Sequence, residues 1–345
     1  MAKIQIEYLW IDGAKPYAKL RSKTKIVDPA TITAGEGHIN LAGIPAWGFD
    51  GSSTSQATTK DSDRMLTPVA LFPDPIRGDD NLIVLCEVCY FDGKPHESNT
   101  RRKLATLAGK HQLTLRPLVG FEQELILMHE NRPLRWPSVG APVREQGPYY
   151  CGVGFDEVYG QQVKELHVKY CLGAGLEICG TNAEVMPGQW EFQIGAAEPL
   201  VCADHLWVGR YLFYKAAEHF GIHATLDPKP YTNWNGSGLH TNFSTEPMRT
   251  EGGRAVIDQA IERLSQRHVE HMQVYGADNE KRLTGEHETS RYDKFTSAVG
   301  HRGVSVRIPQ QVAEAGRGYF EDRRPAASAD PNEILTAMLT TVCGE

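Results

Sequence analysis

The chain of 345 residues has little of what marks several large classes of protein. No apolar run approaches the roughly 20 residues of a membrane-spanning helix, which argues against a membrane partner. The 36 lysines and arginines are outnumbered by 43 aspartates and glutamates, and the formal charge of −7 argues against a nucleic-acid partner, whose binding needs a basic surface. The first four residues contain no apolar segment typical of a secretory signal, so we expect a cytoplasmic protein.

Cysteines are few and scattered. There are seven, and an odd, scattered set is not a disulfide framework. Cys86 and Cys89 form a C-x-x-C pair that could indicate zinc or redox chemistry, but no second cysteine or histidine pair follows at zinc spacing. Because the pair lies in the apolar segment 82–90, which is typical of a strand, we interpret both residues as core cysteines.

The chain also lacks internal repeats and the P-loop motif, G-x-x-x-x-G-K followed by Ser or Thr. What is present is a globular composition, with 41% hydrophobic residues, and a length that suits about two domains. The first hundred residues are typical of short strands: residues 4–10 alternate apolar and polar, and Asp12-Gly13 predicts a hairpin turn. A helix is predicted over residues 101–110. We therefore place a boundary near residue 100, giving domains 1–100 and 101–345.

The second part mixes strands and helices. The spacing of apolar residues predicts helices over residues 156–174, 204–220 and 255–275. Acidic residues inside apolar, strand-like segments are its informative feature. In the first such segment, residues 119–127, Glu122 and Glu124 share one face because strand side chains alternate. Their charges repel unless a cation lies between them, although a solvent-facing strand edge is the simpler interpretation.

The second acidic segment covers residues 182–193 and contains a turn signal, Pro187-Gly188. If these two residues form the whole loop, Glu184 lies directly opposite Glu191, with Cβ atoms about 5 Å apart, where like charges are destabilising. Two same-face acidic pairs are hard to explain as surface decoration. Hard divalent cations such as Mg²⁺ or Mn²⁺ explain them better, because these ions prefer oxygen ligands.

Two further elements extend the pattern. His240 follows a glycine-rich turn in the segment 233–244 and could contact a metal or a phosphate, although a lone histidine is more often structural. Arg302, Arg307, Arg323 and Arg324 form a separate cationic set, and guanidinium groups clamp carboxylates and phosphates. Acidic metal ligands beside arginines suggest phosphoryl transfer from a magnesium nucleotide.

At these residues the sequence resembles the glutamine synthetases of type II, the short class typical of eukaryotes and found in some bacteria. The resemblance runs from about residue 4 to residue 343. The blocks that carry it are long and distinctive: residues 47–63, 120–124, 147–154, 182–195, 227–245, 282–290 and 318–331.

The resemblance implies an α+β fold, with a small N-terminal β-grasp domain and a catalytic domain built on a curved antiparallel sheet with flanking helices. It implies ligation of ammonia to L-glutamate with ATP as co-substrate. The glutamate side chain would take the γ-phosphate to form γ-glutamyl phosphate, and ammonia would displace that phosphate. Two or three Mg²⁺ or Mn²⁺ ions per site are implied as cofactors.

The resemblance also implies roles for individual residues. One metal would be held by Glu124, Glu184 and Glu191, and another, nearer the ATP phosphates, by Glu122, His240 and Glu321. Glutamate would be held by Asn233, Trp234, Asn235, Gly236, Arg282, Arg302 and Arg323. ATP would be bound by Glu122, Asn242, Phe243, Ser244, Arg302, Arg307 and Tyr319.

The remaining implied residues are catalytic. Asp50 would help to deprotonate ammonium in a pocket completed by Ser53, Tyr150 and Glu184. Glu288 would close over the intermediate, and Arg323 is implied as a catalytic residue as well as a glutamate-binding one. In the family the N-terminal domain donates Asp50 and Asp63 to a neighbouring subunit. The implied assembly is a homo-oligomer, a decamer of two pentameric rings with sites between subunits.

Some positions depart from the family pattern: Leu118-Val119, Thr58-Thr59-Lys60, His301 and Gln310. None of them is a presumed ligand, but several lie near the implied substrate site. They leave open a related ligase that joins glutamate or another carboxylate to an organic amine. A third alternative, of a different class, is a non-catalytic regulatory relative, which should have lost metal ligands or the flap glutamate.

Overall fold

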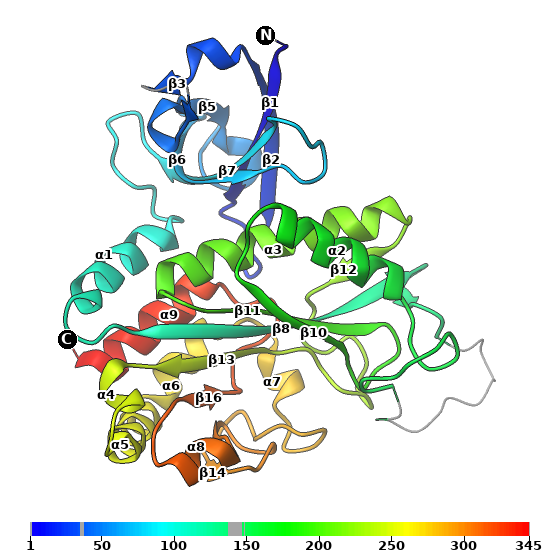
Figure 1. The fold of residues 1–345 in the computed structure, drawn as a ribbon, viewed down its shortest axis with the longest axis vertical. Helices are drawn as coiled ribbons and strands as arrows, with labels where there is room; N and C mark the ends of the chain where they lie inside the picture. The colour runs from blue at the N-terminus through cyan, green and yellow to red at the C-terminus, as the bar shows by residue number, and fades with distance from the viewer. Residues whose placement is uncertain (1, 35–37, 137–146, 148, 345) are drawn as a thin grey trace.

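The computed structural model describes residues 2–34, 38–136, 147 and 149–344. Two separate sheets organise the chain, a five-stranded sheet within the first ninety residues and a nine-stranded sheet in the remainder. Figure 1 shows the smaller sheet above the larger one, with helices α2 and α3 between them. Within the described residues no helix is long and apolar enough to cross a bilayer.

The N-terminal sheet has the strand order β2-β1-β7-β6-β5. Its central pair, β1 and β7, is parallel, and the other neighbours are antiparallel. A buried cluster that includes Tyr8, Trp10 and Phe49 fills one face. The strands are β1 (Ile4–Ile11), β2 (Leu20–Val27), β5 (Trp47–Asp50), β6 (Asp63–Pro73) and β7 (Leu82–Cys89), with a small hairpin of β3 (Thr33–Ala34) and β4 (His38–Ile39) and single turns at Pro29–Thr31, Leu41–Gly43 and Gly51–Thr54.

The predicted tight turn at Asp12-Gly13 is wrong. Strands β1 and β2 are joined by the longer loop 12–19. The Asp12 carboxylate organises this loop by accepting hydrogen bonds from the backbone N–H groups of Ala14 and Lys19 and from the Arg21 guanidinium. An aspartate that caps nearby backbone N–H groups favours a wide loop as readily as a two-residue turn.

The nine-stranded sheet has the order β10-β11-β8-β13-β16-β15-β14, and β9 and β12 also pair with β8. It is called the catalytic sheet below, after the domain that the resemblance implies. All pairs are antiparallel except that of β14 with β15, so the sheet is mixed. The strands are β8 (Leu118–His129), β9 (Arg132–Pro133), β10 (Ile178–Ala183), β11 (Gln189–Ala197), β12 (His223–Thr225), β13 (Leu239–Ser244), β14 (Ser297–Val299), β15 (Val306–Ile308) and β16 (Phe320–Asp322).

Three predicted helices need correction. The helix predicted over residues 156–174 begins only after Gly160, whose φ of 90° is left-handed. The helix predicted over 204–220 begins five residues earlier, at Pro199. The one predicted over 255–275 is two helices, because Arg267 leaves the helical conformation between them. The helices are α1 (Thr100–Gln112), α2 (Gln161–Gly173), α3 (Pro199–His219), α4 (Glu246–Arg249), α5 (Gly253–Gln266), α6 (His268–Val274), α7 (Asn279–Arg282), α8 (Gln310–Ala315) and α9 (Pro331–Leu339), followed by a π-helical turn at Thr340–Gly344.

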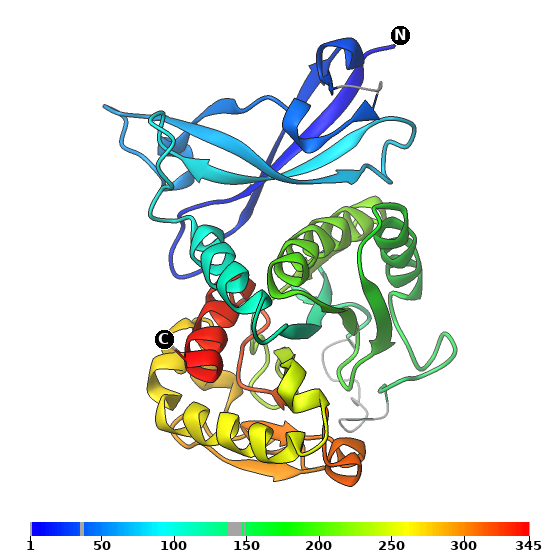
Figure 2. The ribbon, with the colours of Figure 1, turned by 60° about the vertical axis from the view of Figure 1, so that its left-hand side comes forward.

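An apolar contact joins the N-terminal sheet to helices α2 and α3. Leu9, Phe72 and Leu85 of the N-terminal sheet belong to one buried cluster with Val208 of α3 and Cys171 of α2. Figure 2 shows α1 and α3 directly beneath the N-terminal sheet. The catalytic sheet therefore has a covered face toward the N-terminal sheet, and its polar residues gather away from it.

The cysteines behave as the sequence indicates. All seven lie in described residues and are free. Cys86 and Cys89 are buried in β7, and burial raises the pKa of the Cys86 thiol well above its usual value. A protonated, enclosed thiol is a poor metal ligand and a poor nucleophile, so the prediction of core cysteines is confirmed.

Candidate active site

Four neighbouring strands of the catalytic sheet line up polar side chains in cross-strand rows. Glu124 of β8 pairs with Glu191 of β11, and Glu191 pairs in turn with Asn182 of β10. One step along β8, Glu122 lies between Gln193 and His240. Residues two apart on a strand share a face, so both rows point to one side of the sheet.

The other face of β8 keeps this arrangement in place. Gln123, between the two glutamates, is fully buried and accepts a hydrogen bond from Arg210 Nε at 2.7 Å. Its own amide donates to the backbone oxygens of Glu124 and Ala327. Because the buried side chain is fixed on one face, the two carboxylates on the opposite face are held in register.

The predicted register of the acidic hairpin is wrong by two residues. Glu191 pairs with Asn182, and the Glu184 N–H donates to Gln189 O at 2.9 Å, so the loop is residues 185–188. A shift of two residues keeps each side chain on its face. Glu184 therefore lies diagonally across from Glu191 and still converges on it: ligand atoms of Glu124, Glu184 and Glu191 lie within 4.8 Å of one another.

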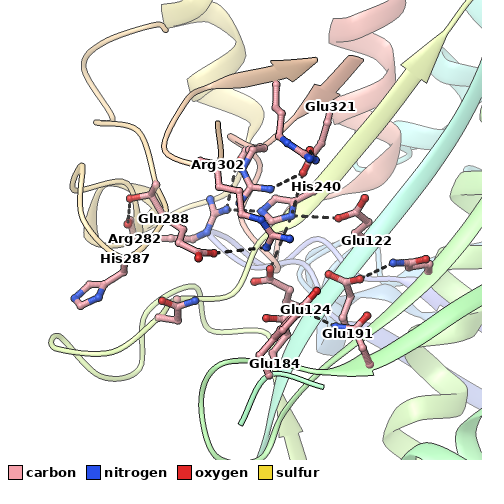
Figure 3. Close-up of a pocket in the computed structure, with 18 residues that line it drawn as sticks. Glu122, Glu124, Glu184, Glu191, His240, Arg282, His287, Glu288, Arg302 and Glu321 are labelled. Atoms are coloured by element: carbon pink, nitrogen blue, oxygen red, sulfur yellow. Dashed lines mark hydrogen bonds and ion pairs between the residues drawn. The ribbon is translucent and has the colours of Figure 1, made fainter. Parts of the chain in front are cut away.

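His240 lies among the carboxylates from β13. Its Nδ1 is 3.5 Å from Glu122 Oε2, 3.7 Å from Glu321 Oε1 and 3.8 Å from Glu124 Oε1. A second group of converging ligand atoms joins Glu122, Glu191 and His240. Figure 3 shows all six candidate ligands facing one cavity, with Glu321 entering from the opposite end to Glu184.

Burial and mutual repulsion perturb these carboxyl groups. Burial raises the pKa of Glu124 to about 7 and, with the charge of Glu124, that of Glu184 to about 8. Burial together with the charges of Glu122 and Glu124 raises the pKa of Glu191 to about 9. These three glutamates retain protons near neutrality. A bound cation would relieve the repulsion among them, because an opposite charge favours the ionised form.

Cationic side chains border the cluster on the β15–β16 side. Glu321 accepts from Arg307 Nη1 at 2.8 Å and from Arg323 Nη1 at 2.5 Å. Arg282 is buried behind His240, with Nη2 3.3 Å from His240 Nε2 and 2.9 Å from Arg323 O. Three of the four arginines of the sequence-predicted cationic set, Arg302, Arg307 and Arg323, line the cavity with the acidic cluster. The prediction is wrong for Arg324, which is buried on the other face of the strand. Arg282 also lines the cavity but makes its hydrogen bonds to protein acceptors.

Charged side chains alternate along β16 and just beyond it. Glu321 and Arg323 face the cavity, whereas Asp322 and Arg324 are fully buried on the other side in a bidentate ion pair of 2.6 and 2.9 Å. Tyr275 donates to the same Asp322 carboxylate at 2.8 Å. Two faces of one short strand thus carry two separate sets of charges.

The cavity has a volume of about 230 Å³ and a polar lining. Tyr150, Glu288 and Arg302 enter it from loops, with Arg302 Nη1 3.7 Å from Glu288 Oε2 and its guanidinium 5.9 Å from the Tyr150 ring. Glu288 and its neighbour His287 both have positive φ, 61° and 52°. Neither is glycine, so the backbone of this loop is strained at Glu288.

A second cavity, of about 290 Å³, adjoins the first and shares Glu122 and Gln193 with it. Asn242, Ser244 and Tyr319, three of the residues predicted to bind ATP, line it. Phe243 also borders it, but its ring is fully buried and packs against Phe320 at 5.8 Å. This cavity has mostly apolar walls, including Leu118, Val119 and Ile194, and suits a flat aromatic ring.

Not all the predicted glutamate-binding residues reach the first cavity. Asn235 and Gly236 line it. Asn233 is exposed outside it, and Trp234 packs against Trp136 with ring centroids 5.1 Å apart. The backbone oxygen of Trp234 accepts from Lys229 Nζ. These residues shape the turn that presents Asn235 and Gly236.

Asp50, Ser53 and Asp63 lie away from this cavity, on the N-terminal sheet. Asp50 ends β5 and pairs with Asp63 at the start of β6. Its carboxylate accepts hydrogen bonds from Ser52 N, Ser52 Oγ and Ser53 Oγ, and the hydroxyl and backbone donors of Ser52 hold the pKa of Asp50 below its usual value. Within one chain, the described residues do not bring these groups to the acidic cluster.

The sequence interpretation missed four residues that line the cavity: Asn182, Gln193, His287 and Thr289. Asn182 Nδ2 donates to Glu184 at 2.9 Å, and Gln193 Nε2 donates to Glu191 at 2.7 Å. The signal that could have found them is alternation, since Asn182 precedes Glu184 by two residues and Gln193 follows Glu191 by two. They orient the carboxylates they contact.

The arrangement fits hard divalent cations. Five carboxylates and one imidazole converge, and amides and backbone N–H groups, such as that of Gly238 on Glu124 Oε2 at 2.6 Å, orient the oxygens. Oxygen-rich ligand sets with such supporting contacts suit Mg²⁺ or Mn²⁺. The bordering arginines suit anionic groups of a substrate.

Comparison with known proteins gives the same picture. Residues 3–90 match the family model of the glutamine synthetase β-grasp domain, and residues 97–272 match that of the glutamine synthetase catalytic domain. The chain is 49% identical to a glutamine synthetase of Xenopus laevis over 99% of this chain and 86% of the relative. It is 51% identical to a glutamine synthetase of Streptomyces viridochromogenes over 98% of this chain and 96% of the relative. A cryo-EM structure of a Plasmodium falciparum glutamine synthetase matches its fold with a TM-score of 0.77 at 16% identity, covering 99% of this chain and 71% of that one.

Proposed function

The chain belongs to the glutamine synthetase family, and from this premise we propose how its cavity carries out the family's reaction. The protein is an ATP-dependent ligase that forms glutamine from glutamate and ammonia. The observation that carries the proposal is the convergence of all six candidate metal ligands beside the two cavities. Identity of about half over nearly the whole chain does not favour the amine ligase or the non-catalytic alternative.

Two or three Mg²⁺ or Mn²⁺ ions are proposed to be held by the acidic cluster. Glu124, Glu184 and Glu191 would hold one, and Glu122, His240 and Glu321 another. When bound, the ions would neutralise the phosphate oxygens of ATP and orient them. Asn182, Gln193 and the Gly238 N–H would keep the glutamate oxygens aimed inward, because each donates to one of them.

ATP is proposed to enter through the second cavity. Its adenine would lie between the apolar walls near Val119 and Tyr319, with the phosphates toward Glu122. Arg307 and Arg323 contact Glu321 in the wall of the first cavity, so they would face the transferred phosphoryl group and stabilise its charge. Leu118-Val119, one of the departures from the family pattern, lines this cavity.

Glutamate is proposed to lie in the first cavity, between Asn235, Gly236 and the arginines. Its side-chain carboxylate would take the γ-phosphate to give γ-glutamyl phosphate. Arg302 and Glu288 contact each other and are both about half exposed. The strained loop at Glu288 would close over this intermediate and exclude water.

Ammonium would be bound and deprotonated where Tyr150 and Glu184 meet Asp50 and Ser53. Because Asp50 lies on the N-terminal sheet, we propose that a neighbouring subunit supplies Asp50, Ser53 and Asp63. This requires a homo-oligomer with sites between subunits, and a decamer of two pentameric rings is the assembly proposed. The domain boundary near residue 100 and a cytoplasmic location, which suits seven free cysteines, belong to the same proposal.

A product assay tests the proposed function. Purified protein with ATP, Mg²⁺ and glutamate should release ADP in proportion to added ammonia, with glutamine as the product by mass. A panel of organic amines at equal concentration is the control for acceptor choice. ADP release that does not depend on ammonia, or a faster reaction with an amine, would contradict the proposal.

A further inference from the structure

The loop between β1 and β2 contacts both functional regions of the chain. On the N-terminal side, the Gly13 N–H donates to Thr54 O at 2.9 Å, within the turn Gly51–Thr54 that directly follows Asp50. The contact is close: a Cβ on residue 13 would stand 2.3 Å from Ser55 O, so only glycine fits. The loop is therefore fixed to the segment that carries Asp50 and Ser53.

The same loop reaches into the catalytic domain through Tyr17. Its hydroxyl donates to Asp278 Oδ2 at 2.5 Å and lies 3.5 Å from Ala277 O. The neighbouring loop residues Pro16 and Ala18 and the catalytic-domain residue Glu280 border a cavity of about 630 Å³. At this place the two domains thus face each other across a space, and the Tyr17 hydrogen bond crosses between them.

Asp278 directly precedes helix α7, which presents Arg282 to the cavity. Asp278 has a positive φ of 56°, a conformation that needs support from its surroundings. The next residue, Asn279, donates to Arg324 O at 2.7 Å and accepts from Arg282 Nη1 at 3.3 Å. Arg282 in turn contacts His240 and Arg323 O. The position of Asp278 therefore sets where the single turn of α7, and with it Arg282, begins.

We infer that Tyr17 is a positioning residue that fixes α7 and Arg282 from the N-terminal domain of the same chain. The inference rests on the proposed function for its kinetic consequence, since Arg282 is proposed to serve glutamate. Through this one loop, the segment proposed to serve a neighbour's site is joined to the helix proposed to serve the chain's own site. Burial and the Asp278 charge raise the Tyr17 pKa, so the hydroxyl remains a donor throughout the neutral range.

The variant Tyr17→Phe tests this inference, with Tyr90→Phe as a matched control. Tyr90 also donates to a carboxylate, Glu97 Oε2 at 2.6 Å, but does so away from α7. In the full enzyme, Y17F should raise the KM for glutamate about threefold to tenfold, with kcat and the KM for ATP within about twofold of wild type. This is less than the loss of a direct hydrogen bond to a charged group would give, because Tyr17 acts on Arg282 only through Asp278. Y90F should match wild type. An unchanged glutamate KM in Y17F, or equal changes in both variants, would overturn the inference.

Hydrogen exchange gives a readout that does not depend on activity. Amides of residues 278–284 should exchange faster in Y17F than in wild type and Y90F, while those of β8 stay unchanged. Asp278→Asn keeps an oxygen that can accept from Tyr17, so it should have a smaller effect than Y17F. Equal exchange in all proteins would refute the link. Should wild type make no glutamine, the proposed function fails, and the exchange experiment alone decides the role of Tyr17.

Discussion

The N-terminal sheet and the catalytic sheet both present acidic residues, but in opposite electrostatic settings. Asp50 is exposed, and hydroxyl and amide donors lower its pKa. Glu124, Glu184 and Glu191 are buried together, and burial raises their pKa values. The difference shows that carboxylates of one protein can be prepared for different tasks by their surroundings alone. The three buried glutamates need a cation to be ionised at neutral pH, whereas Asp50 is ionised without one.

This contrast suits a division of labour. A carboxylate that stays ionised can attract an ammonium cation without help from a metal, although a lowered pKa makes it a weaker base. A buried acidic cluster can bind a divalent cation strongly, because the cation removes the repulsion that raises the pKa values. Experiments on each region can test this difference between Asp50 and the buried glutamates, and the largest effect is expected at the glutamates.

Loss of one cluster carboxylate should abolish the activity. Glu184→Ala removes a ligand atom from the group formed with Glu124 and Glu191, so glutamine formation should fall about 100-fold or more. Mg²⁺ should also raise the melting temperature less than it does in wild type. Glu262→Ala, on the exposed face of α5, is the control and should change neither quantity. An active E184A protein would show that the cluster is not the metal site.

Mixing two inactive variants tests whether the two regions act from different subunits. Asp50→Ala leaves the cluster intact, whereas Glu184→Ala leaves the N-terminal sheet intact. Randomly mixed rings should recover about a quarter of wild-type activity, because a quarter of the interfaces join two intact halves. Each variant alone, refolded or co-expressed with itself, is the control. No recovery in a verified mixed assembly would place Asp50 outside the neighbour's site.

The raised pKa values predict how stability depends on pH without metal. The folded protein holds protons on Glu124, Glu184 and Glu191 that the unfolded chain loses above about pH 4.5. The free energy of unfolding should therefore fall as pH rises from about 4.5 through about 7 to 9. In EDTA, we expect the melting temperature to fall by about 5 °C over this range. Saturating Mg²⁺ should remove the fall, because it binds the ionised form. A melting temperature that rises with pH in EDTA would contradict the assigned shifts.

The smallest effect is expected at the C-x-x-C pair. Cys86→Ala should leave kcat and metal content unchanged and lower the free energy of unfolding by about 1 kcal/mol, through the lost packing of a buried side chain. Activity and denaturant unfolding on the same preparation check both parts. Loss of bound zinc or of activity would revive a chemical role for the pair.

The local pattern of the sequence predicts much of the site. Alternation along β8 was enough to place Glu122 and Glu124 on one face, and the structure confirms it. Glu184 and Glu191 converge as expected, although the register differs. Pro187-Gly188 marks a turn but does not set its length, and the loop takes four residues, which preserves the face of each carboxylate.

Other features depend on contacts between distant segments and are not visible in a local pattern. The break at Arg267 interrupts an otherwise regular apolar spacing. Arg282 is predicted to face glutamate, but in the structure it donates to Asn279, His240 and the backbone oxygens of residues 323 and 324, which lie on three separate segments. The proposed approach of Asp50 to the acidic cluster of a second chain is likewise beyond any pattern within one chain.

The alternation on β16 has a consequence for accuracy in folding. A slip of this strand by one residue would turn Asp322 and Arg324 into the cavity and bury Glu321 and Arg323 against Tyr275. Such a slip would leave the wrong charges on both faces, and buried charges without matched partners are strongly unfavourable. The buried Asp322–Arg324 ion pair therefore specifies the alignment of this strand. A strand of only three residues, held between β13 and β15, can in this way direct the Glu321 carboxylate to the same place every time the chain folds.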